Sequence, residues 1–211
     1  MNNDTILQEY LYDLSDNDIS LEEDIEHGER TLFWKGTFAR ANYKNQNNRW
    51  YPTEIMAEAY NQVKTKMNKG EMLCGYMDHP VNPEEAKRVQ LEHIALTFPE
   101  LTFNESTGNL YGVCKPTYTP KGEILKGLQK SGIKIGFSSR AAGKVKPGKT
   151  ALGEDALIVQ PGMKLLAIDA VKCPSANCFP QAITEEVTVE EAIKKYWYFN
   201  NTGKSIIEKL F

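Results

Sequence analysis

The sequence is poor in the features that mark membrane, secreted and nucleic-acid-binding proteins. It has no run of about 18 apolar residues, so no transmembrane helix is expected. Its first residues, MNNDTILQEYLYD, are acidic and lack a basic n-region, so we expect no signal peptide. Four cysteines in 211 residues predict reduced thiols rather than a disulfide framework. A net charge of -3 gives no argument for binding to nucleic acid.

What is present fits an ordinary globular protein. Hydrophobic residues make up 41% of the chain and charged residues 25%, and the length suits one domain with a sizeable core. Residues 1–30 hold ten acidic residues and one basic residue, which leaves 24 basic and 18 acidic residues in the remainder. We expect an acidic and flexible arm (1–30), a central domain (31–185) and a helical tail (186–211). The acidic arm either stays solvated or lies across a basic groove of the body.

Short apolar segments alternate with turns along the central domain. Helical spacing predicts one helix opened by Pro52-Thr53 and closed by Gly70, and another over 121–130. Strands are predicted at 31–43, 91–98, 109–115, 133–137, 156–160 and 163–171. A polar turn is predicted at 45–48 and a loop over 143–153. A C-terminal helix is predicted to start at the capping box formed by residues 188–191. The pattern is mainly β with peripheral helices (α+β) and lacks a regular βαβ repeat.

The three histidines are the scarcest titratable residues. His27 lies in the acidic arm, where a solvated side chain is favoured, and His93 lies at the start of a predicted strand, where a structural or surface role is favoured. His79 lies in Gly75-Tyr-Met-Asp-His-Pro80, where proline prevents the chain from continuing as a helix or inner strand. This segment places an imidazole on a rigid loop, as functional side chains often are; a structural turn histidine is the alternative.

Two further segments carry polar groups within apolar strands. Ser138 and Ser139 end the predicted strand in Lys134-Ile-Gly-Phe-Ser-Ser-Arg140-Ala-Ala-Gly143, where hydroxyl and backbone N–H groups suit a nucleophile and its oxyanion donors. The alternative is a strand end with a polar turn, and Arg140 at the last position of Gly-x-Ser-x-Gly excludes a nucleophile elbow. Asp169 interrupts the apolar strand 163–171. If buried it needs a histidine or arginine partner, whereas an outward-facing aspartate is the alternative.

Together these residues suggest a serine-protease triad in the chain order His79, Ser138, Asp169. That order differs from those of chymotrypsin, subtilisin and the α/β-hydrolases. Either the fold is a different one or the three residues do not form a triad.

Four stretches of sequence occur in an order typical of one protease family. They are Asn48-Arg-Trp-Tyr-Pro52, Gly75-Tyr-Met-Asp-His-Pro80, Ile135-Gly-Phe-Ser-Ser-Arg140-Ala-Ala-Gly143 and Ile168-Asp-Ala-Val-Lys-Cys-Pro-Ser-Ala176. With them the chain resembles the phage prohead (procapsid maturation) serine proteases of the T-even prohead core protease type, over roughly residues 30–180. The family often has Glu-Leu in place of Tyr76-Met77 and Pro in place of Asn177, which affects substrate contacts rather than the triad.

The resemblance implies a β-barrel akin to the herpesvirus assemblins, formed by residues 31–185. It implies a serine endopeptidase with Ser138 as nucleophile, His79 as general base and Asp169 as the acidic member, and no cofactor or metal. Arg140 would order the turn or contribute to the oxyanion hole, as arginines of assemblins do, unless it is a surface salt-bridge partner. Ser139 is the fallback nucleophile or a turn-forming hydroxyl.

The resemblance also implies where the enzyme acts and on what. Its substrates would be phage scaffold, core and capsid proteins, cleaved in the immature prohead within the host cytoplasm. The family cuts after Glu in Leu/Ile-x-Glu motifs, and such motifs in this chain predict self-processing: Leu7-Gln-Glu9, Leu21-Glu-Glu23, Ile183-Thr-Glu185 and Ile206-Ile-Glu208. We further expect a homo-oligomer, with the run 196–199 serving as core or interface.

Two alternatives to a protease remain open at the level of sequence. One is a structural zinc module built from the pairs Cys74-x4-His79 and Cys173-x4-Cys178, whose spacings lie at the edge of the usual range. The other is a non-catalytic scaffold or tube protein that shares the barrel fold.

Overall fold

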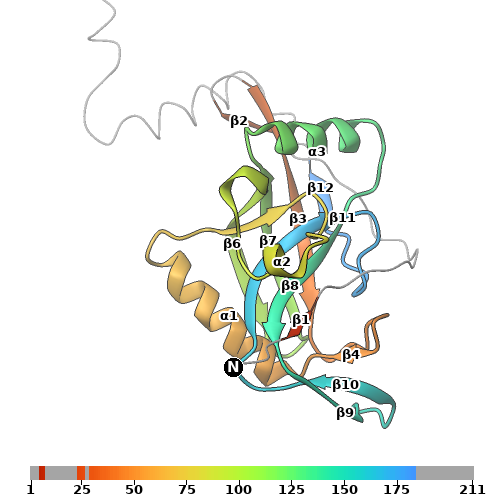
Figure 1. Cartoon of the computed structure of the whole chain (residues 1–211). Helices are drawn as coiled ribbons and strands as arrows, with labels where there is room; N and C mark the ends of the chain where they lie inside the picture. Colours follow the sequence, from red (N-terminus) through yellow and green to blue (C-terminus); the bar gives the residue numbers. More distant parts are fainter. Residues whose placement is uncertain (1–4, 8–22, 27–28, 184–211) are drawn as a thin grey trace, which may run out of the picture.

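The protein is described by a computed structural model, in which the described residues are 5–7, 23–26 and 29–183 (Figure 1). The predicted C-terminal helix and the aromatic run 196–199 lie outside these residues, as does most of the acidic arm. No helix in the part of the chain that the structure describes is both long and apolar enough to cross a bilayer.

The largest sheet is antiparallel throughout. Its strands run in the order β12-β3-β7-β6-β5, and β2 pairs with the start of β3. The bounds are Glu23–Glu26 (β2), Glu29–Arg40 (β3), Leu73–Tyr76 (β5), Ile94–Asn104 (β6), Asn109–Pro116 (β7) and Gln181–Ile183 (β12). The predicted turn between β6 and β7 is present, and Gly108 adopts the positive φ (72°) that it requires.

Two three-stranded sheets complete the β-structure. One has the order β1-β8-β11, with all pairs antiparallel, and comprises Thr5–Leu7 (β1), Gly136–Gly143 (β8) and Lys164–Val171 (β11). The other has the order β4-β10-β9 and comprises Arg49–Trp50 (β4), Val145–Lys149 (β9) and Asp155–Val159 (β10). A parallel bridge between Met77 and Ala170 joins the end of β5 to β11.

The helices lie around the sheets (Figure 1). They are Thr53–Met67 (α1), Pro83–Ala86 (α2), Pro120–Lys130 (α3) and the 3-10 turn Leu91–His93 (η1). α1 follows Pro52 and buries one face, formed by Ile55, Met56, Ala59, Tyr60 and Val63. Lysines in its last turn complement the helix dipole. Both helices predicted from spacing are therefore confirmed to within a few residues.

An aromatic cluster ties β8 to the large sheet. Phe137 of β8 packs edge-to-face against Phe38 of β3 (ring centroids 5.0 Å apart) and against Trp34 (5.5 Å), and Phe38 in turn contacts Phe98 of β6 (5.1 Å). Burial of each such ring contributes about 1.5–3 kcal/mol. Because side chains alternate along a strand, anchoring Phe137 in this core turns the next residue, Ser138, toward the opposite face of β8.

Four sequence predictions need correction. The strand predicted at 133–137 runs instead from Gly136 to Gly143 as β8, so Ser138 and Ser139 lie within it rather than at its end. The loop predicted over 143–153 contains strand β9, because Pro147 and Gly148 give that edge strand the composition of a loop. Strand β5 went unpredicted because its four residues include Gly75. The expected assemblin-like β-barrel is not confirmed: among the described residues, the strand pairs fall into three sheets, two of them joined by the Met77–Ala170 bridge, and no closed barrel is found. The architecture is mainly β with few helices, as the residue pattern indicated.

Candidate active site

His79 lies on a short loop that leaves β5 and runs against β11. Gly75 allows this approach, because a Cβ at that position would lie 1.8 Å from the carbonyl oxygen of Ile168. Asp78 has a left-handed backbone conformation (φ 63°), which aspartate tolerates, and its N–H donates to the carbonyl oxygen of Ala170 (2.8 Å). β5 and the loop that follows it therefore lie against Ile168 and Ala170, the two residues that flank Asp169 in β11.

Ser138 and Asp169 lie opposite each other on the antiparallel strands β8 and β11. His79 lies between their side chains: its Nε2 is 3.1 Å from Ser138 Oγ, and its Nδ1 is 2.7 Å from Asp169 Oδ2. The structure therefore brings together the three residues that the sequence suggested as a triad, although Ser138 and Asp169 lie 59 and 90 positions after His79 in the chain.

The hydrogen bonds define which ring nitrogen of His79 carries the proton. An ionised carboxylate only accepts hydrogen bonds, so Nδ1 donates to Asp169. In the neutral imidazole Nε2 is then unprotonated and accepts a hydrogen bond from the Ser138 hydroxyl. This is the arrangement in which a histidine can remove a proton from a serine.

Arg140 holds Asp169 from the other side. Its Nε donates to Oδ2 (2.9 Å) and its Nη2 to Oδ1 (3.2 Å), while Nη1 donates to the carbonyl oxygens of Ala86 (3.2 Å) and Arg88 (3.3 Å). Arg140 and Asp169 are both 0% exposed, so the alternative of a surface salt-bridge partner does not hold. The guanidinium positions the carboxylate and ties the α2 segment to the site.

Tyr76 contributes contacts that sequence reasoning missed. Its backbone N–H donates to Asp169 Oδ1 (2.9 Å), so each carboxylate oxygen accepts two hydrogen bonds. Its ring lies 4.4 Å from Arg140 Cζ in a cation–π contact, and its hydroxyl accepts from the backbone N–H of Gln90. The sequence marked this position only as a departure from the family pattern, although its place directly after Gly75 could have indicated a close backbone approach.

Burial strengthens these polar interactions. Ser138 is 3% exposed and His79 is 4% exposed, so little water screens the interactions of the hydroxyl and the imidazole with the Asp169 carboxylate. A buried aspartate without partners would be costly, but Arg140 supplies the compensating charge. The arrangement can therefore keep Asp169 ionised beside a neutral imidazole and can stabilise that imidazole when it takes up a proton.

The remaining candidates do not join this hydrogen-bonded chain. Ser139 is half-buried and, as the neighbour of Ser138 on a strand, projects toward the other face of β8. His93 lies in η1, where its ring packs edge-on against Tyr76 (5.5 Å) and its Nδ1 is 2.6 Å from Lys121 Nζ. His27 lies outside the described residues.

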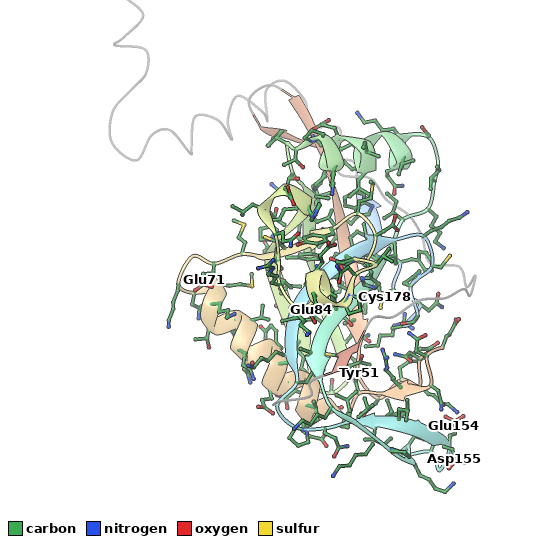
Figure 2. The ribbon with its side chains drawn as sticks, in the orientation of Figure 1. Tyr51, Glu71, Glu84, Glu154, Asp155 and Cys178 are labelled. Carbon is green, nitrogen blue, oxygen red and sulfur yellow. The ribbon has the colours of Figure 1, made fainter. Side chains whose placement is uncertain are left out.

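The structure does not support the zinc alternative. Among the described residues, no three His, Cys, Asp or Glu side chains gather in a way that could hold a metal ion. Both ring nitrogens of His79 already face Ser138 and Asp169. Burial raises the pKa of the Cys178 thiol to about 12, so this sulfur stays protonated near neutral pH. The acidic residues Glu71, Glu154 and Asp155, which could also bind a cation, lie at the periphery of the molecule (Figure 2).

Comparison with known proteins identifies the family. Residues 15–192 match the family described as prohead core protein serine protease. The chain belongs to this family. As a prohead core serine protease it is a peptidase and hydrolase, and the resemblance suggested by the four sequence stretches is confirmed.

The fold of this prohead protease has a known counterpart. The bacteriophage T4 capsid assembly protease is 20% identical in sequence and superposes with a TM-score of 0.64, over 87% of this chain and 100% of that chain. At this identity the likeness concerns the fold. No curated protein matches the chain.

Proposed function

We propose that Ser138, His79 and Asp169 are the catalytic triad of this prohead maturation protease. The observation that carries the proposal is the continuous chain from Ser138 Oγ through both ring nitrogens of His79 to Asp169 Oδ2, with links of 3.1 and 2.7 Å. Family membership supports a serine nucleophile, and the hydroxyl of Ser138 lies within hydrogen-bond distance of His79.

The geometry suits the usual two-step acyl transfer. Ser138 Oγ attacks the carbonyl carbon of the scissile peptide bond while its proton passes to His79 Nε2. The tetrahedral intermediate collapses, the C–N bond breaks, and the leaving amine takes that proton. Water then attacks the acyl-serine ester, giving its proton to His79, and the carboxylic acid product departs as the proton returns to Ser138 Oγ.

Asp169 and Arg140 act on the base rather than on the substrate. Asp169 keeps Nδ1 protonated, orients the ring and stabilises the imidazolium that forms during the reaction. Arg140 fixes the carboxylate through two charge-assisted hydrogen bonds. Its other donated hydrogen bonds reach the carbonyls of Ala86 and Arg88, which favours the turn-ordering role over a place in the oxyanion hole.

Core and capsid proteins of a phage are the substrates that we propose, cleaved after Glu in Leu/Ile-x-Glu segments inside a prohead in the host cytoplasm. The net positive charge of residues 31–211 favours acidic segments. The chain itself is a further substrate in this proposal. In its favour, β1 pairs with β8 only three residues from Ser138, with Leu7 opposite Ala141. Leu7 opens the first Leu-x-Glu motif of the chain, whose next residues lie outside the described part.

The decisive experiment is cleavage of a candidate scaffold protein by wild type and by Ser138→Ala, with the products sequenced. Wild type should cut after Glu, and Ser138→Ala should not cut while it retains the circular dichroism spectrum of the folded protein. Ser139→Ala is the matched control, because it removes the same hydroxyl from the neighbouring residue and should preserve turnover. Loss of cleavage in Ser139→Ala alone would reassign the nucleophile. Absence of any cleavage by wild type would favour a non-catalytic relative of the same fold.

A further inference from the structure

The edges of the Arg140 guanidinium are held by hydrogen bonds. Nε and Nη2 donate to the two oxygens of Asp169, and Nη1 donates to the carbonyl oxygens of Ala86 and Arg88. Because such bonds depend on angle as well as distance, a small rotation or displacement of the planar group weakens all of them together. Asp169 is therefore held firmly only while a neighbouring side chain packs against the guanidinium and keeps it in place.

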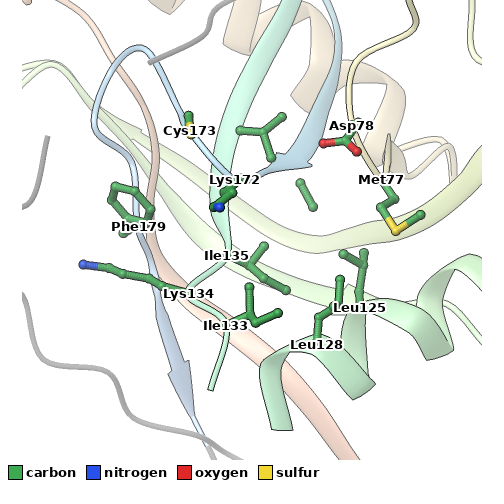
Figure 3. Close-up of a pocket in the computed structure, with 12 residues that line it drawn as sticks. Met77, Asp78, Leu125, Leu128, Ile133, Lys134, Ile135, Lys172, Cys173 and Phe179 are labelled. Atoms are coloured by element: carbon green, nitrogen blue, oxygen red, sulfur yellow. The ribbon is translucent and has the colours of Figure 1, made fainter. Parts of the chain in front are cut away.

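The ring of Tyr76 packs against this group. Arg140 Cζ lies over the ring, 4.4 Å from its centroid, and Tyr76 is only 4% exposed. At a buried position the attraction between the cation and the ring is strong, because little water competes for the guanidinium. Met77, the next residue, instead lines a mostly apolar pocket of about 540 Å³ with Leu125 and Leu128 of α3 (Figure 3). Neighbouring side chains of an extended chain face opposite ways, which turns Tyr76 toward Arg140.

Tyr76 is itself anchored to the segment that follows α2. Its hydroxyl accepts a hydrogen bond from the backbone N–H of Gln90, and the ring of His93 packs against it edge-on, with the ring centroids 5.5 Å apart. The hydroxyl also lies 3.5 Å from the carbonyl oxygen of Arg88, to which Arg140 Nη1 donates. The tyrosine ring and the guanidinium are thus fixed to the same short segment, so neither moves without disturbing the other.

We propose that Tyr76 is a positioning residue of the protease, a role that rests on the proposed function. Its ring holds the Arg140 guanidinium against Asp169 and keeps water away from the pair, and Asp169 in turn orients His79. Tyr76 acts on the base through the arginine rather than on the substrate. Its backbone N–H to Asp169 survives every substitution except proline, so substitutions test the side chain alone. Loss of the ring should therefore slow the chemical step and leave peptide binding unchanged.

Two substitutions, assayed on a peptide that the wild type cleaves, separate the ring of Tyr76 from its hydroxyl. Tyr76→Leu keeps an apolar side chain but removes both groups, and should lower kcat about tenfold while KM stays within about twofold. Tyr76→Met, with an unbranched side chain that fills irregular space, replaces the leucine variant if that variant does not fold. Tyr76→Phe keeps the ring and should retain kcat within about threefold of the wild type. Equal losses in the Phe and Leu variants, or a loss carried by KM, would overturn the proposal.

Tyr60 of α1 provides a matched control. It is also buried, its hydroxyl donates to the carbonyl oxygen of Leu101 (3.2 Å), and Lys64 Nζ lies 5.7 Å from its ring centroid. Tyr60→Leu therefore removes a buried ring, a hydroxyl and a cation–π contact, but its lysine partner is not bonded to Asp169. This variant should leave kcat of the folded enzyme unchanged. A fall in kcat equal to that of Tyr76→Leu would show a general loosening of the fold and refute the role of Tyr76.

Proton exchange at Arg140 gives a second readout that needs no activity. In isotope-labelled protein followed by NMR, the Nε–H of Arg140 should exchange with water at least about tenfold faster after Tyr76→Leu, whereas Tyr76→Phe should leave it slow. Unchanged exchange and unchanged kcat in Tyr76→Leu, with cleavage still lost in Ser138→Ala, would contradict the positioning role alone. Exchange that depends on the ring, in a protein whose wild type cleaves no peptide, would support the contact and contradict the proposed function alone.

Discussion

Arg140 and Asp169, on neighbouring strands, form a doubly hydrogen-bonded ion pair that is entirely buried, with Nε–Oδ2 and Nη2–Oδ1 distances of 2.9 and 3.2 Å. The pair lets the fold keep a carboxylate ionised at the end of a hydrogen-bonded chain to a serine. Removing either partner leaves a buried charge without compensation.

Replacing Arg140 with Met should therefore lower the free energy of unfolding by about 3–5 kcal/mol, because it leaves the buried Asp169 carboxylate without a compensating charge. Urea titration followed by circular dichroism measures the change. Lys149→Met is the control: it breaks an exposed ion pair with Asp155 and should cost less than about 1 kcal/mol. Equal, small changes in both variants would show that Asp169 is not charged in the folded protein.

Asp169→Asn should leave a small residual rate, whereas Ser138→Ala and His79→Ala should abolish proteolysis. An amide can donate to Nδ1 and so stabilise the wrong ring tautomer, which in such triads lowers kcat by about 10⁴. Initial rates on a fluorogenic peptide, measured with folded variants, provide the comparison. An Asp169→Asn enzyme with nearly wild-type kcat would remove Asp169 from the triad.

Gly75→Ala should impair both folding and activity, because the added Cβ would meet the Ile168 carbonyl oxygen at 1.8 Å and push β5 away from β11. We expect a loss of about 1–3 kcal/mol in unfolding free energy and a larger proportional loss in kcat, since His79 moves with β5. Gly127→Ala, where a Cβ would meet nothing within 4 Å, should be neutral or stabilising by up to about 1 kcal/mol. A fully active and stable Gly75→Ala protein would contradict this close approach.

Self-processing should shorten the wild-type chain after Glu at one or both ends, while Ser138→Ala remains at 23.9 kDa. Intact mass after long incubation measures this directly. A proline in place of Ile6 removes an N–H from the strand that pairs with β8, and should alter trimming at the N-terminal motif without altering cleavage of an added peptide. Wild-type protein that stays intact while cutting a scaffold would reject self-trimming and leave the protease assignment in place.

The cysteines should differ sharply in reactivity. Burial raises the pKa of Cys178 to about 12 and also raises that of Cys114, so both should resist a thiol reagent at pH 8 until the protein unfolds. The half-buried Cys173 should react first. Because the folded-state pKa of Cys178 exceeds the value of about 8.5 for an exposed thiol, the stability due to its neutral form is complete below that value and is lost as pH rises toward 12. Rapid labelling of Cys178 in native protein at pH 8 would contradict its burial.

Local features of the fold were predictable from sequence, and long-range ones were not. The spacing of apolar residues predicted α1 and α3 because a helix uses neighbours within one turn. Strand β9 was mistaken for a loop because Pro147 and Gly148 are tolerated on an edge strand. The β-barrel was predicted from the family resemblance alone. Closure of a sheet depends on pairing between strands that are distant in sequence, which local residue patterns do not reveal.

The same division applies to the site. The Gly75–Pro80 segment singled out His79 because its proline indicated a rigid loop, and the apolar strand 163–171 singled out Asp169 because a buried carboxylate needs a partner. The contacts of Arg140 depend on the register of β8 with β11 and on carbonyls more than 50 positions away, at Ala86 and Arg88. Sequence alone does not determine such contacts. The sequence therefore left three roles open for Arg140: ordering the turn, contributing to the oxyanion hole, or pairing with a charge at the surface.

Labelling with an active-site-directed fluorophosphonate tests the triad most directly, because the reagent forms a stable ester only with a serine activated by a base. The reaction is followed by peptide mass mapping of the folded protein, with His79→Ala as the variant that lacks the base. We expect a single adduct on Ser138 in the wild type, with labelling lost in His79→Ala. An adduct on Ser139 or another residue, or equal labelling of Ser138 without His79, would contradict the triad.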